Sequence, residues 1–425
     1  MLKVLVVVAV VVVCAQAPPQ QPPTFRSGAQ VVEVDVRVFD RAGHFVTDLK
    51  PAEIELTEDG APQKIQSLIL VGSAPSAPAP VAPVAPVAPV APAPVAPLAP
   101  SVWLLVFDTN HLTPAGLKHS RDAVDAFVGN RLHGGELIGI VIDGRMVNGR
   151  LTTSVEELRK AIASLKMPGE LRSRQFEMRE WPRLRDEYEA IRIAQYEDEE
   201  ALRTAVQRAC LDDPDMCRRL PVDQIIRGKA KRVMAAVRTA TLSTLATIER
   251  LGIGLAKVAG PKTIVFLSEG FVVQEFEAQL QQAVGQANRA GVHFYTIDAR
   301  GLNKGVASSD IIDARFVDMP GDIKPIDMQT DGTNSLAIDT GGIAVRNEND
   351  FGRALDAIQR DPGTYYVLGY SPTNQTFDGK YRTIGVKVRR DSVKVRARRG
   401  YVALQPARLI APSGSGGGSG GGSGG

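Results

Sequence analysis

Short apolar segments alternate with amphipathic ones over residues 101–362, and this pattern constrains the fold more than any other feature. Residues 102–107, 137–142, 263–267 and 292–297 are largely apolar, and segments with helical periodicity separate them. Strands that are apolar on both sides must be covered on both faces, as in a parallel sheet whose crossovers are helices. The sequence therefore predicts an α/β fold with a doubly wound, mostly parallel sheet.

A long insertion, residues 168–259, interrupts this series and is rich in Arg and Glu. Its acidic and basic residues are interleaved, which is typical of solvated helices with i,i+4 charge pairs, although a partner-binding arm is the alternative. Cys210 and Cys217 lie within it. In an exported chain two nearby cysteines favour a disulfide over a metal site, and two unpaired thiols are the other reading.

The two ends of the chain predict a small antiparallel β module. Residues 28–72 contain a strictly alternating strand and the tight-turn pair Asp59-Gly60. Residues 363–404 return to alternating strands. The N-terminal segment is too short to be stable alone, so the C-terminal strands should complete either this module or the edge of the large sheet.

Three further segments lie outside these folded parts. Residues 1–17 combine Lys3, an apolar run and Ala-Gln-Ala, which predicts a cleaved signal peptide and a periplasmic, cell-surface or secreted protein. The apolar run is too short to span a bilayer, so no transmembrane segment is expected after cleavage. Residues 73–100 repeat Ala, Pro and Val and predict a semi-rigid polyproline II linker. Residues 413–425 form a flexible Gly/Ser tail.

Composition and motifs argue against nucleic-acid binding and against catalysis. The net charge of +3 provides no general attraction to nucleic acid. Outside the Gly/Ser tail the sequence has no Gly-x-Ser-x-Gly, and it has no phosphate-binding loop, no His-Glu-x-x-His and no Cys-x-x-Cys. Its histidines are scattered, and His111, although near Asp108, is more readily explained as a surface-loop residue. We therefore expect a protein that is not an enzyme.

Polar residues follow the predicted parallel strands at their carboxyl ends, where doubly wound sheets bind ligands. They include Asp143 and Asp298 as well as the four candidate metal ligands, which are Asp108, Asn110, Ser268 and Glu269. Such oxygens could hold Mg²⁺ or Ca²⁺. Asp, Asn and Ser are also the favoured caps of the helices that follow such strands, and both readings stay open.

Several motifs together resemble the von Willebrand factor A-related family of exported bacterial proteins. They are residues 102–110, the Glu58-Asp59-Gly60 turn, residues 263–270, 295–302, 339–342 and 365–372. The resemblance implies a von Willebrand factor A-like fold and a protein-binding or adhesion module. Its metal-competent relatives present a divalent ion to an acidic group on a partner.

The resemblance also implies a degenerate metal site. Relatives with a complete site carry Asp-x-Ser-x-Ser, and the matching positions here are Asp108, Asn110 and Leu112. Leu112 cannot coordinate a metal, and Glu269 replaces the later aspartate of the family pattern. Thr241 and Thr152 are candidates for the threonine that the pattern places between these positions.

A different function follows from the basic residues of the C-terminal strands. They alternate with apolar residues and are Lys387, Arg389, Lys394, Arg396 and Arg398. Such a cationic face could bind an anionic polysaccharide and would suit an envelope or extracellular structural protein, although charged residues also protect edge strands from aggregation. The leading expectation remains an exported module that binds an unidentified protein.

Overall fold

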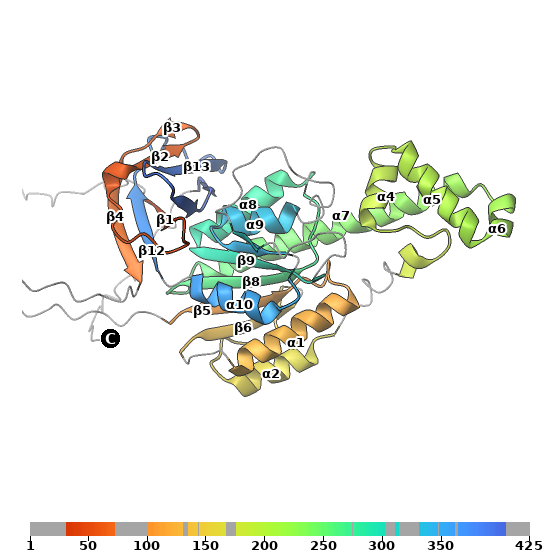
Figure 1. The fold of residues 1–425 in the computed structure, drawn as a ribbon, viewed down its shortest axis with the longest axis horizontal. Helices are drawn as coiled ribbons and strands as arrows, with labels where there is room; N and C mark the ends of the chain where they lie inside the picture. The colour runs from red at the N-terminus through yellow and green to blue at the C-terminus, as the bar shows by residue number, and fades with distance from the viewer. Residues whose placement is uncertain are drawn as a thin grey trace, which may run out of the picture.

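The computed structural model describes residues 31–72, 100–130, 135–142, 144–166, 176–273, 275–301, 311–313, 331–346, 348–361 and 364–404 (Figure 1). The predicted signal peptide, the linker up to residue 99 and the Gly/Ser tail lie outside these residues. Within the described ranges, none of the helices combines the length and the hydropathy that a membrane span requires.

A seven-stranded sheet forms the centre of the molecule, in the order β10-β11-β9-β8-β5-β6-β7. Its parallel strands are β5 (Val102–Phe107), β6 (Leu137–Ile142), β8 (Lys262–Ser268), β9 (Val292–Asp298) and β11 (Ile343–Val345). The short strands β7 (Arg145–Met146) and β10 (Ile311–Asp313) are antiparallel and lie at the two edges. The prediction of an α/β fold with a mostly parallel sheet is confirmed.

Alternate residues of the central strands face two different helical layers. Trp103, Leu105 and Phe107 of β5 pack in the core beneath α1 (Pro114–Asn130), α2 (Val155–Ser164) and α10 (Phe351–Arg360). Leu104 and Val106 face the opposite core, beneath α8 (Glu277–Arg289), α9 (Asp331–Asp339) and the C-terminal part of α7 (Val222–Leu255). Burial on both faces explains why these strands are continuously apolar.

The strand order also indicates where a ligand-binding crevice lies. If the strands are numbered along the chain from β5 as 1, and the edge strand β10 is left out, the spatial order β7-β6-β5-β8-β9-β11 reads 3-2-1-4-5-6. This is the strand order of doubly wound sheets. The direction of winding reverses between β5 and β8, so the crossovers that leave these strands run to opposite faces. Side chains that follow β5 and β8 therefore flank the position where such sheets bind ligands.

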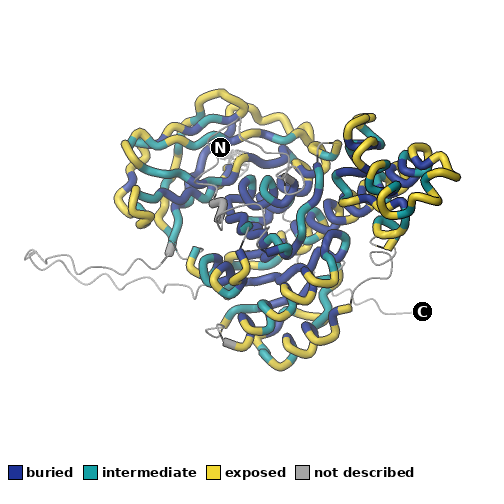
Figure 2. Tube along the Cα trace, turned by 45° about the vertical axis from the view of Figure 1, so that its right-hand side comes forward, coloured by how far each residue is buried: buried dark blue, intermediate teal, exposed yellow. Residues whose placement is uncertain are grey.

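The insertion forms a helical arm that comprises residues 176–186, α4, α5, α6 and the part of α7 up to Val237. The first three helices are α4 (Glu187–Ala194), α5 (Glu199–Asp212) and α6 (Pro214–Arg219). The arm has its own apolar core, while the 34-residue α7 runs from the arm to the sheet (Figures 1 and 2). The side chains of Asp198 and Asp213 accept hydrogen bonds from the first amides of α5 and α6, and so cap these helices. Cys210 and Cys217 form a disulfide, as predicted.

N-terminal and C-terminal strands build two small antiparallel sheets beside the α/β unit. The first has the order β14-β1-β12-β4 and the second β15-β13-β2-β3. Their strands are β1 (Val32–Phe39), β2 (Ile54–Glu58), β3 (Ala61–Pro62), β4 (Ile65–Gly72), β12 (Thr364–Tyr370), β13 (Tyr381–Val388), β14 (Lys394–Ala397) and β15 (Gly400–Val402), with a 3-10 turn at Pro51–Glu53. One apolar cluster fills the space between the sheets, so these strands form a module of their own.

Two buried ionic clusters join this β module to the α/β unit. In the first, Asp361 pairs with Arg396 and, at 3.8 Å, with Arg37, and it accepts a hydrogen bond of 2.6 Å from the Tyr295 hydroxyl. Burial would raise the pKa of Asp361, but the two guanidinium groups outweigh it and lower the pKa to about 2.

In the second cluster, Asp35 lies 2.8 Å from both Arg398 Nη2 and His293 Nε2. His293 Nδ1 lies 2.7 Å from the carbonyl oxygen of Thr340, so this ring bridges the β module and the central sheet. Both clusters therefore place module residues directly against residues of the α/β unit.

The predicted cationic face is wrong for two of its five residues. Arg396 and Arg398 are only 1% and 8% exposed, because β14 pairs with β1 and this side of it meets the α/β unit, where Asp361 and Asp35 neutralise them. Lys394 is half-buried, and only Lys387 and Arg389 are exposed. Arg389 pairs with Glu55 at 2.6 Å. The strands therefore present no continuous cationic surface.

Candidate functional site

The carboxyl ends of β5 and β8 bring two predicted site residues together. These strands are adjacent and parallel, with Phe107 opposite Leu267, so the residues that follow, Asp108 and Ser268, lie side by side. Ser268 Oγ donates a hydrogen bond of 2.8 Å to Asp108 Oδ2. Asp108 is 5% exposed, so its carboxylate depends on protein donors rather than on water.

A threonine of α7 completes one side of this carboxylate. Thr244 Oγ1 donates to Asp108 Oδ1 at 2.8 Å and accepts a hydrogen bond of 3.1 Å from Asn110 Nδ2. The predicted candidates Thr241 and Thr152 are wrong. Thr241 lies almost one turn earlier on α7, and Thr152 bridges to Ile138 instead. The sequence contains several threonines on this helix, and only its position against the sheet selects Thr244.

His111 is the third partner of Asp108, and its predicted surface location is wrong. Its Nδ1 lies 2.9 Å from Asp108 Oδ2, and its side chain is 2% exposed. The chain turns back after β5, with the His111 amide donating to the Asp108 carbonyl, so the ring folds inward beside Phe271 at 5.4 Å. Within the described part of the chain, His111 Nε2 is buried without a hydrogen-bond partner.

The contact with Asp108 indicates which ring nitrogen of His111 carries a proton. Burial would raise the pKa of Asp108, but His111 and the hydroxyl donors Ser268 and Thr244 outweigh it and hold the pKa below the ordinary value. An ionised Asp108 can only accept, so His111 Nδ1 must carry a proton toward it. The second ring nitrogen, Nε2, is the one left for another contact.

Glu269 lies outside this cluster and has a different role. Its Oε1 accepts hydrogen bonds from the Thr113 amide at 2.8 Å and from the Thr113 hydroxyl at 2.5 Å, at the start of α1. Burial raises its pKa above the ordinary value. Sequence reasoning did not identify Thr113, which lies one residue before the helix and there meets the longer side chain of Glu269.

The four predicted metal ligands do not fit a site for Mg²⁺ or Ca²⁺. Both oxygens of Asp108 already accept protein hydrogen bonds, Asn110 binds Thr244, and Glu269 turns to Thr113. The described residues contain no group of three or more His, Cys, Asp or Glu side chains that could hold a metal. Hard cations need several oxygen ligands, and here His111 occupies one side of the central carboxylate.

Two further predicted edge residues do not add to this set. Asp143 lies outside the described residues. Asp298 forms an ion pair of 2.6 Å with Arg300.

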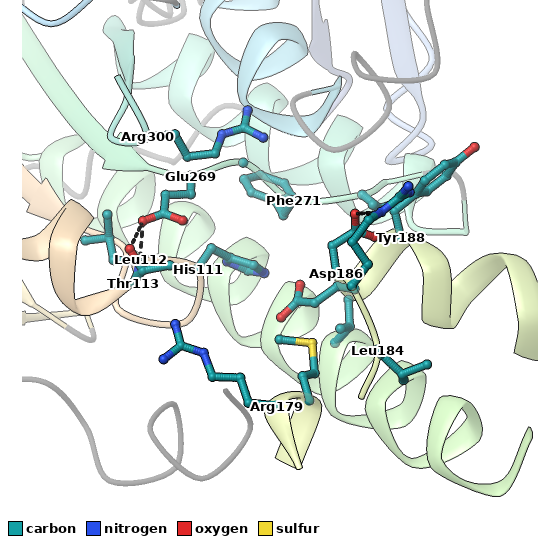
Figure 3. A pocket seen from close by; sticks show the side chains of 16 residues that line it. His111, Leu112, Thr113, Arg179, Leu184, Asp186, Tyr188, Glu269, Phe271 and Arg300 are labelled. Atoms are coloured by element: carbon teal, nitrogen blue, oxygen red, sulfur yellow. Dashed lines mark hydrogen bonds and ion pairs between the residues drawn. The ribbon is translucent and has the colours of Figure 1, made fainter. Parts of the chain in front are cut away.

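A pocket of about 310 Å³ opens between this edge of the sheet and the helical arm (Figure 3). The sheet side contributes His111, Leu112, Thr113, Glu269, Gly270, Phe271, Val272 and Arg300. The arm side contributes Met178, Arg179, Leu184, Arg185, Asp186, Glu187, Tyr188 and Val237. The arm wall was not predicted, because a charge-rich helical sequence does not show which turn faces the sheet.

The hydroxyls of Ser268 and Thr244 are both directed at the Asp108 carboxylate, away from the apolar lining of the pocket. Apolar walls with a few directed polar groups are typical of ligand pockets.

Comparisons with known proteins leave the family open. No protein-family model matches the chain, and no curated protein matches it. Among solved structures, the chain is similar to an aerotolerance-related membrane protein from Bacteroides fragilis, with 11% identity and a TM-score of 0.28. The match covers 61% of this chain and 97% of the other. A likeness at this TM-score carries no argument, so function must be inferred from the site.

Proposed function

We propose that this chain is an exported binding module of von Willebrand factor A type, whose ligand binds in the pocket between the sheet edge and the helical arm. The observation that supports this most directly is the position of the pocket. It lies at the carboxyl ends of β5 and β8, where the winding of the sheet reverses and where open α/β sheets bind ligands.

Under this proposal, the helical insertion has a role, because it forms one wall of the pocket. Leu184, Tyr188 and Val237 of the arm line the pocket opposite Phe271. Without the arm, the carboxyl edge would be an open surface rather than a pocket. We therefore assign the arm to ligand selection.

The experiment compares two tyrosines of the arm. Tyr188 lines the pocket, whereas Tyr196 is 49% exposed and does not. The mature protein and its Tyr188→Ala and Tyr196→Ala variants are cross-linked in extracts of the source cells, and bound proteins are identified by mass spectrometry. We expect one partner that is retained by Tyr196→Ala and lost from Tyr188→Ala. Equal recovery with both variants would contradict binding in the pocket.

The alternative function, binding of an anionic polymer through the C-terminal strands, loses its main support. Two of its five basic residues are buried in ion pairs with Asp35 and Asp361, and Arg389 is paired with Glu55. Polyanion binding needs accessible cations that can replace the counterions of the polymer. We therefore propose protein binding alone.

A further inference from the structure

We propose that this pocket receives an uncharged aromatic group with one hydrogen-bond donor, and that Nε2 of His111 accepts the hydrogen bond from that donor. Among protein side chains, the indole ring of a partner's tryptophan has this chemistry, because its nitrogen donates and does not accept. This inference rests on the proposed function, because it names what the partner presents to the same pocket.

The hydroxyl groups around Asp108 show that its carboxylate acts as an acceptor. Ser268 Oγ accepts a hydrogen bond of 3.0 Å from the Gly270 amide, so its own proton is directed to Asp108 Oδ2 at 2.8 Å. Thr244 Oγ1 likewise accepts from Asn110 and donates to Asp108 Oδ1. Although burial raises the pKa of Asp108, the imidazole and these hydroxyls lower it below its ordinary value, so the group is ionised at neutral pH.

The neutral imidazole of His111 presents an acceptor to the pocket. Nδ1 lies 2.9 Å from the ionised Asp108, so the single proton of the ring lies on Nδ1, and Nε2 keeps a lone pair that can only accept. In Figure 3 the ring of His111 points into the pocket. Nε2 is buried and has no hydrogen-bond partner among the residues that the structure describes. A buried acceptor without a partner is unfavourable, so a ligand donor that reaches Nε2 gains free energy.

The charges of the lining favour an uncharged ligand. The pocket is lined by three acidic and three basic side chains, which are Asp186, Glu187, Glu269, Arg179, Arg185 and Arg300. Arg185 pairs with Asp186 at 2.9 Å, and Arg300 pairs at 2.6 Å with Asp298, outside the lining. Because neither sign is in excess, no general attraction selects an ion. A carboxylate would in addition meet the lone pair of Nε2, which offers it no proton.

The apolar lining residues favour a flat ring as the body of the ligand. They are Met178, Leu184, Val237, Phe271 and Val272. The ring centre of Phe271 lies 5.4 Å from that of His111, and a second aromatic ring can pack beside Phe271 in the same way. The thioether of Met178 also makes favourable contacts with the edges of aromatic rings.

The size of the pocket agrees with a single side chain of this kind. Its volume of about 310 Å³ is at the small end of the range for ligand pockets. Burial of the apolar ring area is then the main source of affinity, and the hydrogen bond to His111 selects the ring that carries a donor.

The test uses indole and 1-benzofuran, which have the same shape but differ in that an oxygen replaces the N–H donor. Binding of each probe to the protein at pH 8 is measured by NMR titration. We expect indole to bind about 10-fold more tightly, the effect of one hydrogen bond to an otherwise unpaired buried acceptor. The His111→Phe variant should bind both probes equally, because it keeps a ring but lacks the acceptor. The matched control, His119→Phe, changes an exposed histidine of α1 and should keep the preference of the wild type.

A second measurement uses the wild type only, and so does not depend on whether the His111 variant folds. With ¹⁵N-labelled histidine, the free protein should show a proton on Nδ1 of His111 and none on Nε2. Indole should shift the Nε2 resonance, and benzofuran should leave it in place. A proton on Nε2 in the free protein, or a resonance that saturating indole does not move, would overturn the contact.

The other outcomes separate this inference from the proposed function. Equal binding of indole and benzofuran to the wild type would overturn the hydrogen bond to His111 and leave a working pocket. Tighter binding of benzoate than of indole would overturn the preference for an uncharged group. If neither indole nor benzofuran binds, the ligand class is wrong, and the comparison of Tyr188→Ala with Tyr196→Ala still decides whether the pocket binds a partner.

Discussion

Two buried aspartates in this molecule are neutralised in opposite ways. Asp361, between the β module and the central sheet, faces the guanidinium groups of Arg37 and Arg396. Asp108, at the carboxyl edge of the same sheet, faces two hydroxyls and one imidazole. Arginine is permanently charged, so the first arrangement pairs charge with charge, whereas the second holds the carboxylate by hydrogen bonds from two hydroxyls and a ring nitrogen.

The difference separates a structural contact from a candidate binding site. At the junction each charge meets a charge of the opposite sign, and the side chains of Asp361 and Arg396 are 7% and 0% exposed. At the edge, both oxygens of Asp108 accept hydrogen bonds, whereas Nε2 of His111 has no hydrogen-bond partner among the residues that the structure describes. Similar burial therefore satisfies every charge in one place and leaves a polar atom without a described partner in the other.

The largest effect is expected at the junction. Asp361→Asn would leave Arg37 and Arg396 buried without their counter-ion, and breaking a buried pair destabilises a protein by about 3–5 kcal/mol. Urea unfolding measures the loss. Asp122→Asn is the control, because Asp122 forms an exposed pair with Lys118 and should change stability by less than about 1 kcal/mol. Equal losses in the two variants would show that the junction is not held by charge.

A smaller loss is expected at the edge. Asp108→Asn removes the ionised acceptor of Ser268, Thr244 and His111, but these partners can remain neutral after the change. We expect the free energy of unfolding to fall by about 1.5–3 kcal/mol, the range for hydrogen bonds to a charged group. The same urea experiment tests this. A loss larger than that of Asp361→Asn would reverse the comparison.

Acid should reveal the contribution of Asp361. Its pKa is lowered from 3.8 to about 2, so its ionised form stabilises the fold above pH 3.8, and this contribution is lost as the pH falls through 2. The shift corresponds to roughly 2 kcal/mol. The stability difference between wild type and Asp361→Asn should therefore shrink by roughly this amount between pH 5 and pH 2. A difference that is independent of pH would contradict the assigned pairing.

The smallest effect concerns Glu269. Its pKa is raised by burial, so the carboxyl destabilises the fold progressively as the pH rises from its ordinary pKa of 4.5 up to its folded-state pKa, and the loss is complete above that. Glu269→Gln keeps the oxygen that accepts from Thr113 and removes the charge. At pH 7 the variant should be more stable than the wild type, and near pH 4, where the carboxyl is largely protonated in both states, the gain should be smaller. Thermal unfolding at both values checks this, with the exposed Glu156→Gln as control.

Much of the α/β unit could be predicted from the sequence, because its strands are apolar on both sides and its helices show a clear period. The disulfide between Cys210 and Cys217 was predicted from spacing and compartment alone. Periodicity shows which residues share a face but not what covers that face. Arg396 and Arg398 therefore looked like surface residues, although β14 turns them toward Asp361 and Asp35.

The site was only partly predictable for a related reason. Asp108 and Ser268 follow strands that the sequence predicts, but only the structure shows that these strands are neighbours and bring the two residues together. Thr244 comes from a helix 136 residues away in the sequence, and His111 depends on a turn that folds back within three residues. Contacts of this kind depend on tertiary packing, which no local pattern encodes.

The position of β1 has a consequence for the order in which the chain can assemble. This N-terminal strand lies between β12 and β14, and Asp35 meets Arg398, 363 residues later. The ribosome therefore releases β1 long before it has made either of its neighbours. By the time β12 is made, the strands of the large sheet already have their partners. Pairing over such separations is slow, since the loop must close before the contacts form. A chain that stops short of β12 has no finished β module, so β1 is made early but is among the last of the described strands to find its neighbours.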